Sequence, residues 1–341
     1  MRVVKDVLHR DRSIDVLRIV AIVAIVVGHA WSYESPVRLA TYPWHVPIFF
    51  VLSGYLASML GFGELVRRRG QSLLLPYVAW LAIIAAVFVG FDDPLRLLAG
   101  GAHLPRPLNA FWFVTAFFVA IVAAAAIERL LLRWQWVIAT ALLIAGYLTS
   151  DVIHWVPLDA GVGLACVVFV VAGRTLRLWE PRLARPATTG TLMLVASAAL
   201  IVSGAAAPPD LKHGDFGTPV ASAVTAMLIS CGLILVAKRL LAGFDGRTGE
   251  LVSQLSLCGF MVVLTHSAVL QAMREAGAVE WLSFVVALVG PWLVAIMLLR
   301  TPLSLVLCGV PRRAVVPRDS EPAREEEPRH STPSDARVSQ R

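Results

Sequence analysis

Long apolar stretches, with charged residues gathered between them, set the pattern of this chain. The clearest apolar cores lie at 19–27, 79–89, 111–127, 162–172, 191–202 and 220–237. The hydrocarbon core of a bilayer needs about 20 apolar residues per helix, whereas a soluble helix shows a wide polar face. The pattern therefore predicts an all-α, polytopic membrane protein with about ten transmembrane helices.

Charge in the loops indicates how these helices are oriented. We expect spans at 14–32, 44–61, 72–91, 110–127, 136–150, 157–173, 187–206, 218–237, 251–273 and 281–299. With an even number of spans, both termini lie on one side, and most arginines and lysines fall there. The other side holds only Arg38, Arg96, Arg106, Lys212 and Arg274. Because cytoplasmic loops carry such an excess, we predict a multi-pass protein of the cell (plasma or inner) membrane with both termini cytoplasmic.

Composition divides the chain into three parts. Residues 1–13 form a cytoplasmic N-terminal segment, 14–300 the transmembrane domain, and 301–341 a cytoplasmic tail. From about residue 317 the tail has no aromatic residue and one large apolar residue, Val338, so we expect it to be disordered. The basic start resembles a signal peptide, but no small-x-small cleavage site follows, which favours a retained first helix.

The overall charge and the cysteines add no further site. The net charge is +7, and the positive loops explain it without a nucleic-acid partner. The four cysteines form no C-x-x-C pair and lie in or beside apolar segments, so they predict neither a disulfide nor a zinc framework. Histidines on the outer side lack metal-ligand spacing, so we expect no metal.

The first predicted helix carries the most informative residues, Arg18 and His29, separated by ten positions. Ionisable residues are costly inside a bilayer and therefore indicate function. Eleven steps of about 100° return within about 20° of the start, so both side chains share one helix face, about 16 Å apart along the axis. Asp15 lies one turn before Arg18 and could pair with it.

This arrangement suits an acyl thioester that enters from the cytoplasm. Arg18, near the inner end, could hold the phosphates of coenzyme A. His29, near the outer end, could accept the proton of a hydroxyl group and return it, since histidine titrates near neutral pH. His45 lies level with His29 and could complete an acid–base pair or bind the acceptor. The structural alternative is that Arg18 reaches the headgroups and His29 only packs at the interface.

Several motifs together resemble the acyltransferase 3 family of membrane acyltransferases, which includes sugar O-acetyltransferases. Arg18 and His29 match its first helix, and the pattern from His45 through Pro47, Phe49 and Phe50 to Ser53-Gly54-Tyr55 matches its second. Weaker matches are Arg67–Arg69 before Leu73–Tyr77, Trp112–Phe113 and Thr265–His266. The resemblance covers roughly residues 10–300. One departure is Ser72, where many members carry a second arginine.

The resemblance implies transfer of an acyl group, usually acetyl, from cytoplasmic acyl-CoA (acetyl-CoA) to a hydroxyl of an extracytoplasmic or lipid-linked carbohydrate. His29 would be the general base, with His45 as the second catalytic residue. Arg18 and the cluster of Arg67, Arg68 and Arg69 would bind the donor. For the cluster, ordinary positive-inside charge is an equal alternative.

Two further residues are candidates for binding the acceptor. Trp112 could stack on a sugar ring, although aromatic residues there usually form the interfacial belt. His266 could face the same cavity as His29 or bond a neighbouring helix inside the bundle.

A transporter or flippase of a small polar or lipid-linked molecule is the rival interpretation. Such proteins usually show repeats or broken helices at the midplane, and the sequence shows no repeat. We expect membrane lipid and a carbohydrate acceptor as partners, and the sequence leaves the oligomeric state open.

Overall fold

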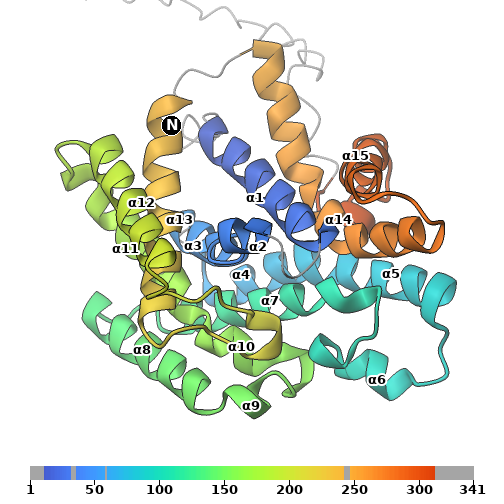
Figure 1. Ribbon diagram of the computed structural model, residues 1–341, viewed down its shortest axis with the longest axis horizontal. Helices are drawn as coiled ribbons and strands as arrows, with labels where there is room; N and C mark the ends of the chain where they lie inside the picture. The colour runs from blue at the N-terminus through green and yellow to red at the C-terminus, as the bar shows by residue number, and fades with distance from the viewer. Residues whose placement is uncertain (1–10, 32–35, 58–59, 242–245, 312–341) are drawn as a thin grey trace, which may run out of the picture.

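A computed structural model describes residues 11–31, 36–57, 60–241 and 246–311, and in these residues the fold is helical throughout (Figure 1). The α-helices are Arg12–Ala30 (α1), Pro36–Thr41 (α2), Pro47–Tyr55 (α3), Phe62–Arg69 (α4), Leu75–Ile84 (α5), Pro94–Ala99 (α6), Trp112–Ala126 (α7), Leu132–Leu148 (α8), Ser150–Ile153 (α9), Ala160–Ala165 (α10), Val167–Trp179 (α11), Pro186–Val202 (α12), Ala221–Leu240 (α13), Gly246–Glu275 (α14), Glu280–Leu298 (α15) and Ser304–Cys308 (α16). π-Helical turns at Gly70–Leu74 and Ala85–Val89 continue α4 and α5. Short 3₁₀ turns lie at Gly101–His103, Leu108–Ala110, Pro157–Asp159, Glu180–Arg182 and Leu211–His213. The predicted all-α fold is confirmed.

Several of these helices are long and apolar enough to cross a bilayer. Within the described ranges they are Arg12–Ala30, Phe62–Val89, Leu108–Ala126, Ala221–Leu240, Arg247–Glu275 and Glu280–Leu298, with a seventh formed by α10 and α11 across a 45° bend. Helices α8 and α12 are apolar but shorter. The segment expected at 44–61 contains α3, whose 9 residues fall short of a bilayer-spanning length. The protein is a polytopic membrane protein, and the count of ten spans stays a prediction.

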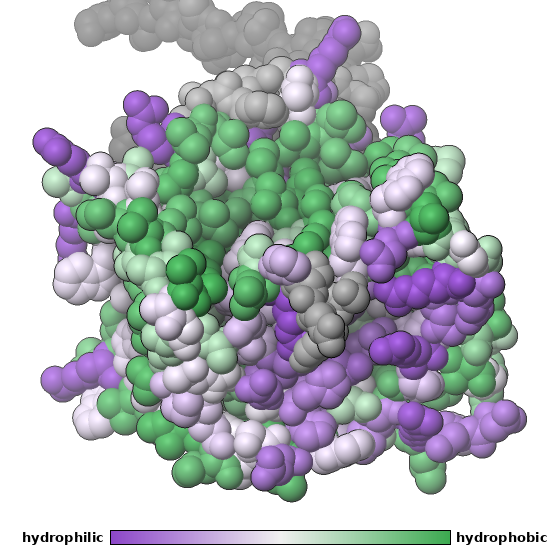
Figure 2. All heavy atoms as spheres, in the orientation of Figure 1, coloured by the Kyte–Doolittle hydropathy of each residue, from purple (hydrophilic) through white to green (hydrophobic). Residues whose placement is uncertain are grey.

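Large apolar side chains cover much of the outside of the helices. On α12, Leu192, Val195 and Val202 are 64%, 61% and 87% exposed. Figure 2 shows such apolar surface over the upper helices, with polar residues gathered in the centre and right of this face. An apolar exterior of this kind suits contact with lipid tails instead of water.

Helices α3 and α11 cross at two glycines. A Cβ atom on Gly173 would lie 2.8 Å from the backbone N of Tyr55, and one on Gly54 would lie 3.0 Å from the backbone N of Arg174. Only glycine therefore allows these two backbones to approach so closely. This crossing fixes α3, and with it His45, which precedes the helix.

A buried carboxylate joins α1 to α14. Asp15 is 1% exposed and accepts hydrogen bonds from Ser253 Oγ at 3.0 Å and Ser256 Oγ at 2.8 Å. Its Oδ1 also lies 3.4 Å from Nη1 of Arg18, which is the pairing expected from the sequence. These bonds satisfy a charge that would otherwise be costly to bury, and they hold Arg18 in the N-terminal half of α1.

The first residues of the expected tail are packed against the helices. α16 contacts α5, α14 and α15, and Trp80 Nε1 donates to the carbonyl of Leu307 at 2.9 Å. The segment expected to be disordered from about residue 317, and most of the N-terminal segment 1–13, lie outside the described residues.

Candidate active site

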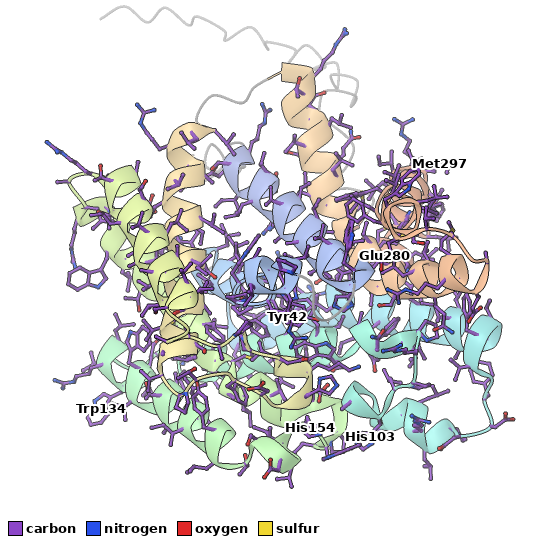
Figure 3. All side chains as sticks on the ribbon, in the orientation of Figure 1. Tyr42, His103, Trp134, His154, Glu280 and Met297 are labelled. Carbon is purple, nitrogen blue, oxygen red and sulfur yellow. The ribbon has the colours of Figure 1, made fainter. Side chains whose placement is uncertain are left out.

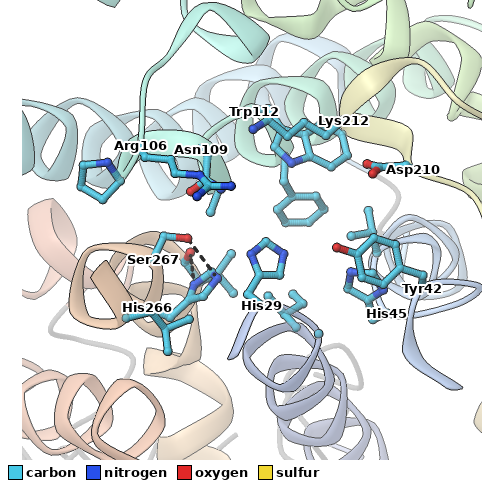
Figure 4. Close-up of a pocket in the computed structure, with 18 of the residues that line it drawn as sticks. His29, Tyr42, His45, Arg106, Asn109, Trp112, Asp210, Lys212, His266 and Ser267 are labelled. Atoms are coloured by element: carbon cyan, nitrogen blue, oxygen red, sulfur yellow. Dashed lines mark hydrogen bonds between the residues drawn. The ribbon is translucent and has the colours of Figure 1, made fainter. Parts of the chain in front are cut away.

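A cavity of about 640 Å³ lies at the C-terminal end of α1 (Figure 4). α1 contributes His29, the turn before α3 contributes His45, and the start of α7 contributes Trp112. Lys212 comes from the segment between α12 and α13, and His266 comes from the middle of α14. Five distant parts of the chain therefore meet here. The volume is typical of a pocket for a small molecule.

His29 is held in place through its backbone. Arg274, in the last turn of α14, donates from Nη2 to the carbonyl of His29 at 2.7 Å. The last carbonyls of a helix have no partner within the helix, so this bond also caps α1. The half-buried His29 imidazole faces the cavity, and its ring centroid lies 5.1 Å from that of His266 at 76°.

The backbone determines which ring nitrogen of His266 carries the proton. Its Nδ1 lies 3.1 Å from the carbonyl of Val262 and 2.9 Å from that of Val263. A carbonyl oxygen can only accept, so Nδ1 is the donor and, in the neutral ring, Nε2 is an acceptor. Ser267 Oγ lies 3.4 Å from this Nε2. The nitrogen of His266 that accepts hydrogen bonds, Nε2, is therefore the one near the Ser267 hydroxyl.

His45 is fixed by the same principle. It is buried, and its Nδ1 lies 2.8 Å from the carbonyl of Thr41, to which it must donate. Its ring is 4.9 Å from that of Tyr42, measured between centroids. His45 lines the same cavity as His29. In the neutral His45 ring, Nε2 can therefore accept a hydrogen bond.

Polar groups from two loops form the outer wall. Asp210 lies 3.3 Å from Arg38 Nη2 and 3.2 Å from His213 Nδ1. The Arg38 guanidinium also lies over the Tyr42 ring, 4.2 Å from its centroid. Burial raises the pKa of the Tyr42 phenol, so this hydroxyl is protonated at neutral pH. Burial lowers the pKa of Lys212 on the same wall.

A second cavity of about 400 Å³ lies beside the arginine cluster of α4. Arg68, Arg69 and Arg174 line it, together with Ser72 of the π-helical turn. Arg174 Nη1 donates to Gln135 Oε1 at 2.6 Å, which steadies one of these cations. π-Helical turns frequently occur at functional sites, since they redirect side chains locally.

Helix α7 connects the two cavities. Phe113 lines the first cavity and Ile121 lines the second, so they are separated by about 12 Å along the helix at 1.5 Å per residue. Aromatic rings lie along this stretch: Phe113 stacks on Phe117 at 5.2 Å, and both contact the fully buried Phe50. A ligand long enough to reach both cavities would therefore contact these three aromatic rings.

The structure brings together some of the predicted site residues and separates others. His29, His45, Trp112 and His266 line the first cavity, and Arg68 and Arg69 line the second. Arg67 lines neither cavity and pairs with Glu64 at 2.9 Å, and Arg68 pairs with the same carboxylate at 2.5 Å. Arg18 also lines neither cavity.

Sequence reasoning missed the loop residues of the site, which are Tyr42, Arg106, Asn109, Asp210 and Lys212. The cations assigned to the outer side could have indicated these residues. Of the five cations on the predicted outer side, Arg106, Lys212 and Arg274 line this cavity, and Arg38 supports it through Asp210. The positive-inside rule explains cations on the predicted inner side, so those on the predicted outer side indicate another role.

Of the other histidines in the predicted outer loops, His213 lines the cavity, whereas His103 and His154 lie elsewhere. His103 and His154 both pack against Trp155, with ring centroids 5.3 and 4.9 Å away. Figure 3 shows these two histidines together at the lower edge of the molecule, away from Tyr42 at its centre. Across the described ranges, no three His, Cys, Asp or Glu side chains form a group that could hold a metal ion.

Comparison with known proteins identifies the class. A family model for the acyltransferase domain of acyltransferase 3 proteins matches residues 11–307, so the chain belongs to the acyltransferase 3 family. The chain is therefore a multi-pass membrane protein of this family. Family membership favours the enzyme over the transporter or flippase.

Among curated proteins, the chain is similar to two nodulation proteins. Nodulation protein NolL of Sinorhizobium fredii is 29% identical over 154 residues, which cover 40% of this chain and 42% of that protein. Nodulation protein NolL of Mesorhizobium japonicum is 26% identical over 130 residues, which cover 33% of this chain and 35% of that protein. The chain thus matches less than half the length of these relatives. No solved structure matches it.

Proposed function

We propose that the protein transfers an acetyl group from cytoplasmic acetyl-CoA to a hydroxyl of an extracytoplasmic or lipid-linked carbohydrate. The observation that carries this proposal is His29, which faces a cavity of about 640 Å³ that also holds His45, His266 and an indole. In a family of acyltransferases, an imidazole in a cavity is suited to activate a hydroxyl.

In the proposed reaction His29 is the general base. Its free ring nitrogen accepts the proton of the acceptor hydroxyl while that oxygen attacks the thioester carbonyl carbon. The new C–O bond forms, the C–S bond breaks, and the imidazolium returns the proton to the departing thiolate sulfur. Nε2 of His266, an acceptor in the neutral ring, suits the role of orienting the His29 imidazole from 5.1 Å, centroid to centroid.

The acceptor would bind on the outer wall of the cavity. Trp112 offers an apolar face for a sugar ring. Tyr42, Asn109 and His45 add hydrogen-bonding groups around it, as sugar hydroxyls require. One polar acceptor hydroxyl would then point toward His29.

The donor would bind at the second cavity. Arg68 and Arg69 would hold the coenzyme A phosphates, because arginine forms paired hydrogen bonds with phosphate oxygens. The pantetheine arm would extend along α7 and deliver the acetyl group to His29. Arg18 would add positive charge at the inner end of α1. In this proposal the protein lies in the bacterial inner membrane with both termini in the cytoplasm. The reaction uses no metal.

Transfer of labelled acetyl from acetyl-CoA to the carbohydrate of the cell envelope tests the proposal. We expect labelling with wild-type membranes. Arg69→Gln and Arg18→Gln should each raise the donor KM by roughly tenfold, which is the loss of one charge-assisted contact. Arg133→Gln, an exposed cation at the start of α8, is the matched control and should change nothing. An unchanged donor KM in both site variants would contradict the donor assignment.

A further inference from the structure

Two cations line the cavity without a carboxylate in direct contact. In the part of the chain that the structure describes, neither Arg106 nor Lys212 forms an ion pair. Arg106 is exposed to the cavity mouth and Lys212 is half-buried. They lie near enough to repel each other electrostatically. Holding two unpaired like charges together costs free energy unless an anion joins them.

The neighbouring carboxylates are engaged elsewhere. Asp210 is held by Arg38 at 3.3 Å and by His213 at 3.2 Å. Glu275 accepts a hydrogen bond from Gln271 at 2.8 Å. The carboxylates of Asp210 and Asp159 both attract Lys212, but only at longer range than an ion pair. Because Asp210 is shared with Arg38 and His213, it offsets the charge of Lys212 only in part, and a ligand in the cavity can still bind both cations.

The positions of these cations fit a substituent on the acceptor. Figure 4 shows Arg106, Asn109, Trp112 and Lys212 on one wall, with His29 facing them. A sugar ring packed on the indole would present a hydroxyl to His29 and another substituent to the two cations. A phosphate carries up to two negative charges and three acceptor oxygens, so it matches two cations and the amide of Asn109 better than a singly charged carboxylate does.

We propose that Arg106 and Lys212 form a subsite for a phosphate group carried by the acceptor, so that the enzyme acylates a phosphorylated or phosphate-linked sugar. This inference rests on the proposed function. The phosphate would anchor the sugar and leave its hydroxyl at His29. In the absence of an acceptor, the two cations repel each other and are solvated by water in the cavity.

Binding to the purified full-length chain in a neutral maltoside detergent, without acyl donor, tests the subsite. Isothermal titration would compare glucose 1-phosphate, glucose, glucuronate and inorganic phosphate. We expect glucose 1-phosphate to bind at least about tenfold more tightly than glucose or glucuronate. Arg106→Gln and Lys212→Gln should each remove about tenfold of that preference, whereas Lys212→Arg should keep it.

Arg96→Gln is the matched control, since Arg96 is an outer cation that does not line this cavity and should leave binding unchanged. Equal binding of glucose 1-phosphate and glucose, or equal binding of glucuronate, would overturn the inference. Unchanged binding in Arg106→Gln and Lys212→Gln would do the same.

A further arm separates the acceptor from a lipid headgroup. Dioctanoyl phosphatidylglycerol should not displace glucose 1-phosphate. If this lipid binds with the same dependence on Arg106 and Lys212 while glucose 1-phosphate does not, the subsite serves membrane lipid and the inference is wrong.

Failure of the proposed function would look different. The wild-type chain would transfer no acetyl group, yet it would still prefer glucose 1-phosphate over glucose, and His29→Ala would bind it as the wild type does.

Discussion

The crossing of α3 and α11 gives a sharp prediction about stability. A Cβ on Gly173 would overlap the carbonyl oxygen of Val51 and lie 2.8 Å from Tyr55 N, so the helices must separate by more than about 0.6 Å to restore the 3.4 Å of ordinary contact. The neighbouring atoms belong to backbone and cannot rotate away. Gly173→Ala should therefore cost about 3 kcal/mol, the upper part of the usual range for overpacking.

Thermal unfolding of the purified protein in detergent measures this effect, with Gly290→Ala as the matched control. Gly290 lies within α15 with nothing within 4 Å of its Cβ position, so alanine should be neutral or stabilise the helix by up to about 1 kcal/mol. Because His45 lies in the turn directly before α3, acetyl transfer should also fall in Gly173→Ala. Equal stability of the two variants would refute the close approach of α3 and α11.

Three further variants test two residues of the proposed mechanism and one ion pair outside the cavities, between Lys238 of α13 and Glu180 after α11. His266→Gln should lower the turnover of acetyl transfer about tenfold or more with little change in donor KM, because it removes the ring that faces His29; an unchanged turnover would count against this role. Asp15→Asn should raise the donor KM severalfold, since Arg18 loses its ionic partner, and identical donor kinetics would contradict it. Lys238→Met leaves Glu180 without the partner at 2.6 Å and should lower stability by about 1–2 kcal/mol in thermal unfolding. A midpoint equal to that of wild type would show that this pair contributes nothing.

Contacts between residues of the same helix could be predicted from the sequence. The spacing of Arg18 and Asp15 predicted their pairing. The apolar runs predicted where most helices lie, because burial in lipid requires them. His45 and His266 were also expected near His29, and all three line one cavity. Their chemical roles remain predictions.

Features that depend on several segments could not be predicted in this way. The outer wall combines Tyr42, Arg106 and Lys212 from separate loops, and loop positions follow from packing rather than from periodicity. The short length of α3 was also missed, since its apolar run continues into flanking residues that are not helical. The π-helical turn at Gly70–Leu74 has no simple signature in the sequence, yet it helps shape the second cavity.

The role of His29 is the central claim, and one comparison tests it most directly. Membranes containing equal amounts of wild type, His29→Ala and His103→Ala are supplied with labelled acetyl-CoA, and label on envelope carbohydrate is counted. His103 packs on Trp155 away from the cavity, so it controls for the loss of a histidine as such. Losing a general base costs about 10²–10⁴-fold, so we expect His29→Ala to abolish detectable transfer while His103→Ala retains it. Transfer by His29→Ala at the wild-type rate would contradict the account.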